Sequence, residues 1–150
     1  KTDEARNFKA GYNCIRQVGL GLIDQAWHNI SVPFEGDVLG YEQQVTDALR
    51  LMPVIKETGI TPQFGHIMSG GYSAGYYSYK WSELLDADAF SVFQKAKGKK
   101  GTIFNKKAAD RYRKNILEKG GSAKPMDLYR AFRGGEPSID ALLKRDGIKK

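Results

Sequence analysis

The sequence contains only two histidines and one cysteine among its 150 residues. A catalytic zinc site usually takes three protein ligands, and the common His-Glu-x-x-His motif needs two histidines four positions apart. His28 and His66 are too far apart to form that motif. The single Cys14 excludes an internal disulfide, and we expect it to be a small buried residue. The chain by itself is therefore predicted to contribute no metal ligands and no disulfide bond.

Long apolar runs are also absent, and so are strands of alternating apolar and polar residues. No uninterrupted apolar stretch approaches the roughly 18 residues that a membrane helix requires, so we expect no contact with a membrane. The first residues, Lys1 to Arg6, do not resemble a signal peptide. Together with the scarcity of cysteine, these absences lead us to predict an all-α fold and a cytoplasmic location.

Acidic residues are scarce in the last third of the chain. Residues 95–150 hold 17 Lys and Arg against 6 Asp and Glu, whereas residues 1–94 hold 7 against 11. Such asymmetry raises the question of a polyanion partner. The basic part lacks both the interleaved aromatic residues of RNA-binding modules and the spacing of helix-turn-helix or zinc-finger motifs. A solvated basic face is the preferred interpretation, and a nucleic-acid partner is not expected.

Prolines, glycines and capping residues divide the chain into helices. The expected helices run from Thr2 or Asp3 to Ile30, and over residues 37–51, 72–96, 105–118, 125–132 and 137–144. Pro33 and Pro53 follow the first two, since proline removes a backbone donor. Gly120 ends the fourth because it tolerates a left-handed conformation. Residues 59–71 are expected to form a loop or a short broken helix, and residues 97–101 a flexible basic turn.

The stretch from His66 to Tyr79 places a histidine, a Gly-Gly pair and four tyrosines within fourteen positions. Three of them, Tyr72, Tyr76 and Tyr79, are spaced i, i+4, i+7, so a helix would direct their hydroxyls from one face. Another face carries apolar side chains at helical spacing, which we expect to pack on a core. These side chains are Tyr77, Trp81, Leu84, Leu85, Ala89, Val92 and Phe93. Judged by residue type alone, a histidine and tyrosines of this kind are more often structural than catalytic.

The same stretch resembles the tyrosine-rich segment of zinc oligopeptidases related to thimet oligopeptidase, oligopeptidase A and bacterial peptidyl-dipeptidase. The similarity lies in residues 66–72 (HIMSGGY) and 75–81 (GYYSYKW). Residues 86–90, 120–122 and 132–143 are similar to the closing segments of that family, and they follow in the family's order. Residues 1–60 match more loosely. Several motifs in order are more specific than any one of them.

The resemblance implies roles for six residues. It implies that His66 and Tyr79 are catalytic and stabilise the tetrahedral oxyanion that forms when water attacks an amide. It also implies that Tyr72 and Tyr76 bind the peptide substrate. The Gly70-Gly71 pair would let the loop flex and its backbone approach substrate, since neither residue carries a Cβ.

Two further polar residues have structural interpretations. His28 is expected to be structural. Arg133 could bind a carboxylate in a bidentate manner, but a salt bridge between the C-terminal helices is the preferred interpretation.

The resemblance further implies that residues 1–150 are the C-terminal helical segment of a larger, mostly α-helical metallopeptidase, whose zinc-binding motif lies upstream. Zinc, short peptide substrates and the missing N-terminal portion are then expected partners of the parent enzyme, and the chain alone should be inactive. The residues do not decide between removal of C-terminal dipeptides and internal cleavage. The alternatives are a basic helical module that binds nucleic acid and a protein-interaction module without catalytic activity.

Overall fold

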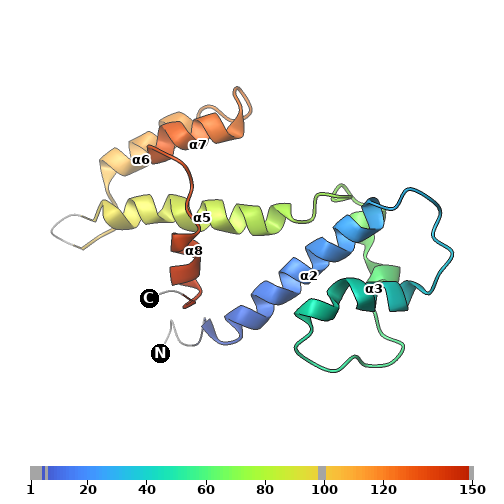
Figure 1. Cartoon of the computed structure of the whole chain (residues 1–150). Helices are drawn as coiled ribbons and strands as arrows, with labels where there is room; N and C mark the ends of the chain where they lie inside the picture. Colours follow the sequence, from blue (N-terminus) through green and yellow to red (C-terminus); the bar gives the residue numbers. More distant parts are fainter. Residues whose placement is uncertain (1–4, 6, 98–100, 149–150) are drawn as a thin grey trace. The chain divides into compact units, whose positions relative to one another are not determined.

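The computed structural model describes residue 5 and residues 7–97 and 101–148, and each regular element in these ranges is a helix (Figure 1). The elements are α2 (Ala10–His28), α3 (Val38–Thr46), η1 (Asp47–Leu49), η2 (Thr61–Gln63), α4 (Gly65–Met68), α5 (Ser78–Lys95), α6 (Lys106–Tyr112), η3 (Arg113–Leu117), α7 (Pro125–Arg133) and α8 (Asp140–Arg145). The prediction of an all-α fold is confirmed. The predicted cap at Thr2 or Asp3 and the centre of the predicted basic turn, residues 98–100, lie outside the described residues.

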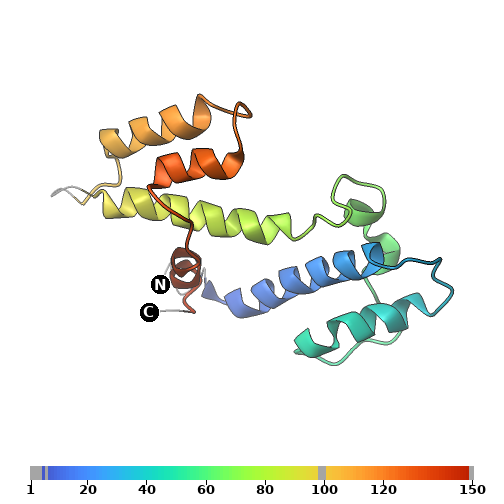
Figure 2. The ribbon, with the colours of Figure 1, turned by 45° about the horizontal axis from the view of Figure 1, so that its top comes forward.

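The chain divides into two compact units, Lys1–Trp81 and Ser82–Lys150, which we describe separately. In the first unit α2 and α3 lie side by side (Figures 1 and 2). The core of this unit joins two residues of α2 to three residues that follow η2. They are Leu20, Ile23, Phe64, Ile67 and Tyr76, with Trp27, Val45 and Ile60 packed against them. The segment that carries the sequence-predicted site is therefore part of the core.

Two carboxylates fix the path of the chain from α3 to that segment. Asp37 caps α3, because its side chain accepts a hydrogen bond from the Leu39 amide at 3.1 Å. Glu42, on α3, accepts hydrogen bonds from the amides of Ile60 at 3.0 Å and Thr61 at 2.7 Å. The broken helix predicted over residues 59–71 is confirmed as η2 followed by α4. Glu42 thus anchors the start of this broken helix to α3.

In the second unit α5 contacts α6 and α7 through the ring of Phe93, and α8 through the ion pair of Asp86 with Arg145. The core residues are Ala87, Ala108, Tyr129, Phe132 and Leu142. Asn105 caps α6 by accepting a hydrogen bond from the Ala108 amide at 3.0 Å. Gly134 ends α7 with φ at 85°, a conformation that a residue without Cβ adopts readily. Local capping signals therefore place these helix ends where the sequence predicts them, within a few residues.

Asp88, on α5, is the centre of a buried polar network in this unit. Its carboxylate accepts the Tyr129 hydroxyl at 2.8 Å, Arg133 Nε at 2.9 Å and Arg133 Nη2 at 3.2 Å. Burial opposes ionisation of Asp88, but the hydrogen bonds from Arg133 and Tyr129 outweigh it and lower the pKa of Asp88. Burial and the bond to Asp88 raise the pKa of the Tyr129 phenol. Arg133 forms a salt bridge, as predicted, but its partner lies on α5, so the bridge joins α7 to α5 and not one C-terminal helix to another.

Four predictions need correction. The first helix does not run unbroken from its start, because residues 8–9 form a turn and Lys9 has φ at 60°. The helix predicted from residue 72 begins only at Ser78, and residues 71–77 form consecutive turns. Ala74 has φ at 56°, which an α-helix does not allow. The apolar stripe is wrong at its start, because Tyr77 is 62% and Trp81 48% exposed. Cys14 is only partly buried. Within the described ranges no helix is both long and apolar enough to cross a membrane.

Candidate functional site

We call residues 66–79 the tyrosine loop. His66 lies on α4, Tyr72 and Tyr76 lie in the turns that follow, and Tyr79 lies in the first turn of α5. Ring centroids are 6.0 Å apart for His66 and Tyr72, 5.1 Å for Tyr72 and Tyr79, and 5.0 Å for Tyr76 and Tyr79. The structure therefore brings the four sequence-predicted aromatic residues together. It does so through turns and not through the continuous helix expected from their spacing.

The four side chains differ in their accessibility. Tyr72 and Tyr79 are 37% and 39% exposed, and His66 is exposed as well. Tyr76 is only 9% exposed, and its ring packs edge-on against Phe64 with centroids 5.0 Å apart. The loop thus presents one imidazole and two phenols at the surface, while Tyr76 ties the cluster to the core of the first unit.

Tyr72 and Tyr79 form a pair within this cluster. Their rings are stacked with an interplanar angle of 24°. The pKa of Tyr79 is raised above its ordinary value. The largest cause is the hydrogen bond between the two side chains, and partial desolvation and the neighbouring phenols contribute less. At neutral pH the Tyr79 phenol therefore keeps its proton. Chemically, the site offers neutral hydrogen-bond donors, as the stabilisation of a developing oxyanion requires.

The turn between the tyrosines is fixed by helix α2. The Asp24 carboxylate accepts the amide of Ala74 through Oδ1 and that of Tyr76 through Oδ2, both at 2.9 Å. The neighbouring Gln25 donates from Nε2 to the Ala74 carbonyl at 2.8 Å. No role of Asp24 was predicted from the sequence. The sequence did contain one indication of such a role: Asp24 is an ionisable residue beside Ile23, on the face of α2 that enters the core.

Gly70 and Gly71 occupy different environments. A Cβ at Gly70 would lie 2.7 Å from the His66 carbonyl oxygen and 3.2 Å from His66 Cα, whereas a Cβ at Gly71 would meet nothing within 4 Å. At Gly70 the chain therefore passes close to its own backbone, and a side chain there would not fit without a shift. Whether either glycine contacts substrate stays a prediction.

This difference predicts unequal effects of two alanine substitutions. Gly70→Ala should displace the backbone at His66 and lower the free energy of unfolding by about 1 kcal/mol or more, because the contacted atoms belong to the backbone. Gly71→Ala is the matched control and should leave stability nearly unchanged. Urea unfolding and the NMR shifts of the His66 ring measure both effects. Equal responses of the two variants would show that the close contact at Gly70 is not a constraint.

The residues that the structure describes do not fit a zinc site. Across residues 5, 7–97 and 101–148, no three His, Cys, Asp or Glu side chains gather in a way that could hold a metal ion. His66 has aromatic ring neighbours. His28 has its Nδ1 2.9 Å from both the carboxylate and the main-chain oxygen of Asp24, a structural position.

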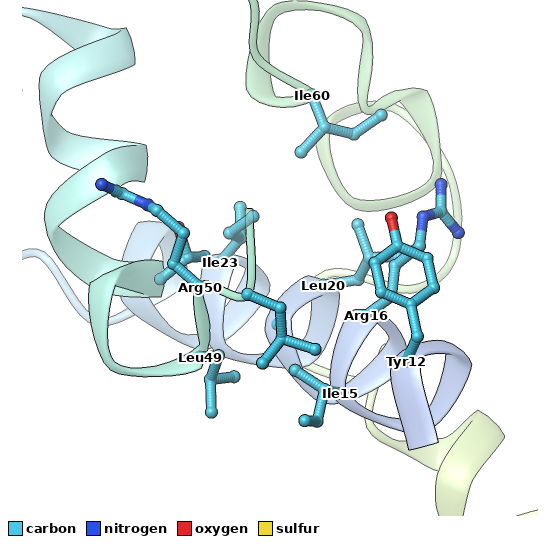
Figure 3. Close-up of a pocket in the computed structure, with 11 residues that line it drawn as sticks. Tyr12, Ile15, Arg16, Leu20, Ile23, Leu49, Arg50 and Ile60 are labelled. Carbon is cyan, nitrogen blue, oxygen red and sulfur yellow. The ribbon is translucent and has the colours of Figure 1, made fainter. Parts of the chain in front are cut away.

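A pocket of about 260 Å³ lies between α2 and the segment from α3 to Leu51 (Figure 3). Its lining is mainly apolar, and the guanidinium groups of Arg16 and Arg50 lie on opposite sides of these apolar side chains in this view. The tyrosine loop contributes no residue to the lining. This pocket is therefore separate from the aromatic cluster.

The chain is similar in sequence to known peptidases over almost its whole length. The model of peptidase family M3 matches residues 1–148. Oligopeptidase A of Escherichia coli (strain K12) is 39% identical over 146 residues, which cover 97% of this chain and 21% of that protein. Probable cytosolic oligopeptidase A of Arabidopsis thaliana is 39% identical over 146 residues, covering 96% and 20%. Dipeptidyl carboxypeptidase of Salmonella typhimurium is 34% identical over 149 residues, covering 98% and 21%.

The chain thus spans about one fifth of the length of the curated relatives that it matches. The matches nevertheless run almost from end to end of the chain and include the tyrosine loop. The resemblance inferred from the motifs is confirmed: this chain belongs to peptidase family M3.

Proposed function

We propose that this chain is the C-terminal helical segment of a zinc-dependent oligopeptidase or peptidyl-dipeptidase that hydrolyses short peptides. The observation that carries the proposal is the exposed cluster of His66, Tyr72 and Tyr79, formed by residues that carry the family motif. Relatives named oligopeptidase A and dipeptidyl carboxypeptidase support this class of reaction. They do not favour internal cleavage over the removal of dipeptides.

The residues of this chain would act on the substrate carbonyl. Attack of water on an amide converts the flat carbonyl into a tetrahedral oxyanion, and donors aimed at this oxygen stabilise the transition state more than the ground state. We assign this role to the phenol of Tyr79 and to an N–H of His66. Tyr72 would bind the peptide backbone beside them. Tyr76 was predicted to do so as well, and its buried ring supports an additional role in holding the cluster.

The division of labour within the parent is part of the proposal. We place the zinc ligands and the general base in the portion outside this chain, because the described residues offer no such ligand set. Large apolar side chains exposed here, such as Trp81 at the start of α5, would then pack against that portion. A cytoplasmic location of the parent is proposed from the name of the cytosolic plant relative.

The first test is to read the coding sequence upstream of Lys1 and to express the complete protein. We expect a His-Glu-x-x-His motif shortly before Lys1 and hydrolysis of short quenched peptides by the zinc-loaded protein. The 150-residue chain is the control and should be inactive. An open reading frame that starts at Lys1, or a complete protein that is zinc-loaded but idle, contradicts the proposal. Nucleic-acid binding that weakens steeply with salt would favour the basic-module alternative.

A further inference from the structure

Among the residues that the structure describes, Asp24 is one of two aspartates with almost no exposed surface, and its environment differs from that of the other. Asp88 is 1% exposed and is neutralised by the Arg133 guanidinium. Asp24 is 0% exposed, and its recorded partners are two backbone amides and the His28 imidazole. A buried carboxylate is costly unless it is paired or hydrogen-bonded. Both backbone amides that donate to Asp24 belong to one place, the turn over residues 74–76.

That turn contains a strained residue. Ala74 has φ at 56°, in the left-handed region that a residue with a Cβ disfavours. Its amide donates to Asp24 Oδ1, and its carbonyl accepts from Gln25 Nε2. Two consecutive residues of α2 therefore hold both polar groups of Ala74. Unfavourable backbone conformations persist only where the surrounding structure enforces them, and such conformations cluster at functional sites.

The second bond of Asp24 connects the turn to the aromatic cluster. Oδ2 accepts the amide of Tyr76, whose ring lies 5.0 Å from that of Phe64 on the core side and 5.0 Å from that of Tyr79 on the other. Tyr79 in turn stacks on Tyr72. A continuous series of contacts therefore runs from the buried carboxylate to the exposed phenols.

We propose that Asp24 is a positioning residue, whose carboxylate fixes the turn over residues 74–76 and thereby sets Tyr72 and Tyr79 against His66. The expected effect of Asp24 on turnover rests on the proposed function of the parent enzyme. Asp24 itself is buried beneath the loop and does not meet the substrate.

Asp24→Asn tests the proposal with little change in shape. Both carboxylate oxygens accept hydrogen bonds, but an amide has only one oxygen. If that oxygen keeps Ala74 and His28, the amide nitrogen faces the Tyr76 N–H, and two donors oppose each other. In the 150-residue chain we expect exchange of the Tyr76 amide hydrogen to accelerate about tenfold or more, and that of Ala74 less. The pKa of Tyr79 should fall toward its ordinary value as the Tyr72 contact loosens.

Asp88→Asn is the matched control, since it removes an equally buried charge from the other unit. It should lower stability but leave the exchange of the Tyr76 amide and the titration of Tyr79 as in wild type. Gln25→Ala is a second test in case Asp24→Asn does not fold, because Gln25 is exposed and its replacement should not disturb the core. It removes only the bond to the Ala74 carbonyl and should accelerate exchange in the turn about threefold.

In the complete protein Asp24→Asn should lower kcat about tenfold with little change in KM, because misplaced donors act mainly on the transition state. A purely structural role predicts instead that Asp24→Asn and Asp88→Asn reduce activity in parallel with the folded fraction, and that result would overturn the proposal. Unchanged exchange at Tyr76 in both Asp24→Asn and Gln25→Ala would overturn it as well. If the wild-type complete protein proves idle, the proposed function fails, and the exchange comparison still decides whether Asp24 positions the loop.

Discussion

Tyr79→Phe in the complete protein is expected to lower kcat about a hundredfold or more, with little change in KM. Phenylalanine keeps the ring that stacks on Tyr72 and contacts Tyr76, so the cluster should stay folded. Only the hydroxyl and its hydrogen bond with Tyr72 are lost. In our proposal this hydroxyl meets the oxyanion, which exists in the transition state and not in the bound substrate. Steady-state kinetics on a short quenched peptide separates the two parameters.

Tyr77→Phe is the matched control for this substitution. Tyr77 lies in the turns that precede Tyr79, but it is 62% exposed. Its ring takes no part in the ring contacts that join His66, Tyr72, Tyr76 and Tyr79. Its hydroxyl should therefore be dispensable for turnover. Zinc content and unfolding temperature should match wild type in both variants. If Tyr79→Phe keeps more than half of the wild-type kcat, Tyr79 is not the oxyanion donor.

Helix ends in this chain were predictable because their causes are local. Asp37 and Asn105 accept hydrogen bonds from amides two and three residues onward, and Gly134 adopts a left-handed conformation one residue after α7. Each signal lies within one turn of the helix end that it defines. The sequence therefore contains the whole explanation of these features.

The tyrosine loop shows where local reasoning ends. The i, i+4, i+7 spacing predicted that Tyr72, Tyr76 and Tyr79 gather, and they do, but through turns and not through a helix. Asp24 causes the difference, and its hydrogen bonds span 50 and 52 positions in sequence. No periodicity within the loop reveals an acceptor that distant. The family resemblance could indicate which residues form the site, but not what holds them.

The apolar stripe of α5 shows a second limit. Helical spacing indicates that a face requires burial, but it does not identify what covers that face. Phe93 is partly buried and its ring contacts that of Phe132, whereas Trp81 remains 48% exposed. In a chain that spans one fifth of its relatives, such a surface is where we propose that the rest of the enzyme packs. The stripe was therefore predicted correctly as apolar, but its first two residues were predicted wrongly as buried by this chain.

Arg133→Ala is expected to lower the free energy of unfolding by about 3 kcal/mol, because it leaves the Asp88 carboxylate buried without its cation. The loss should be smaller in the Asp88→Asn background, and urea unfolding of the four proteins of this double-mutant cycle measures the coupling. Arg130→Ala, on the same helix, is the control. Arg130 pairs with Asp127 and Glu136 at the surface, so its removal should change stability little.

The pH dependence of this loss follows from the direction of the shift. The pKa of Asp88 is lowered in the folded chain, so the pair stabilises the fold fully above about pH 4, the ordinary range for aspartate. This stabilisation disappears as the pH falls through the lowered pKa. The difference between wild type and Arg133→Ala should therefore shrink in acid. If Arg133→Ala kept its stability at neutral pH and instead raised KM for peptides with a free C-terminal carboxylate, Arg133 would be a substrate ligand and not the structural cation that its geometry indicates.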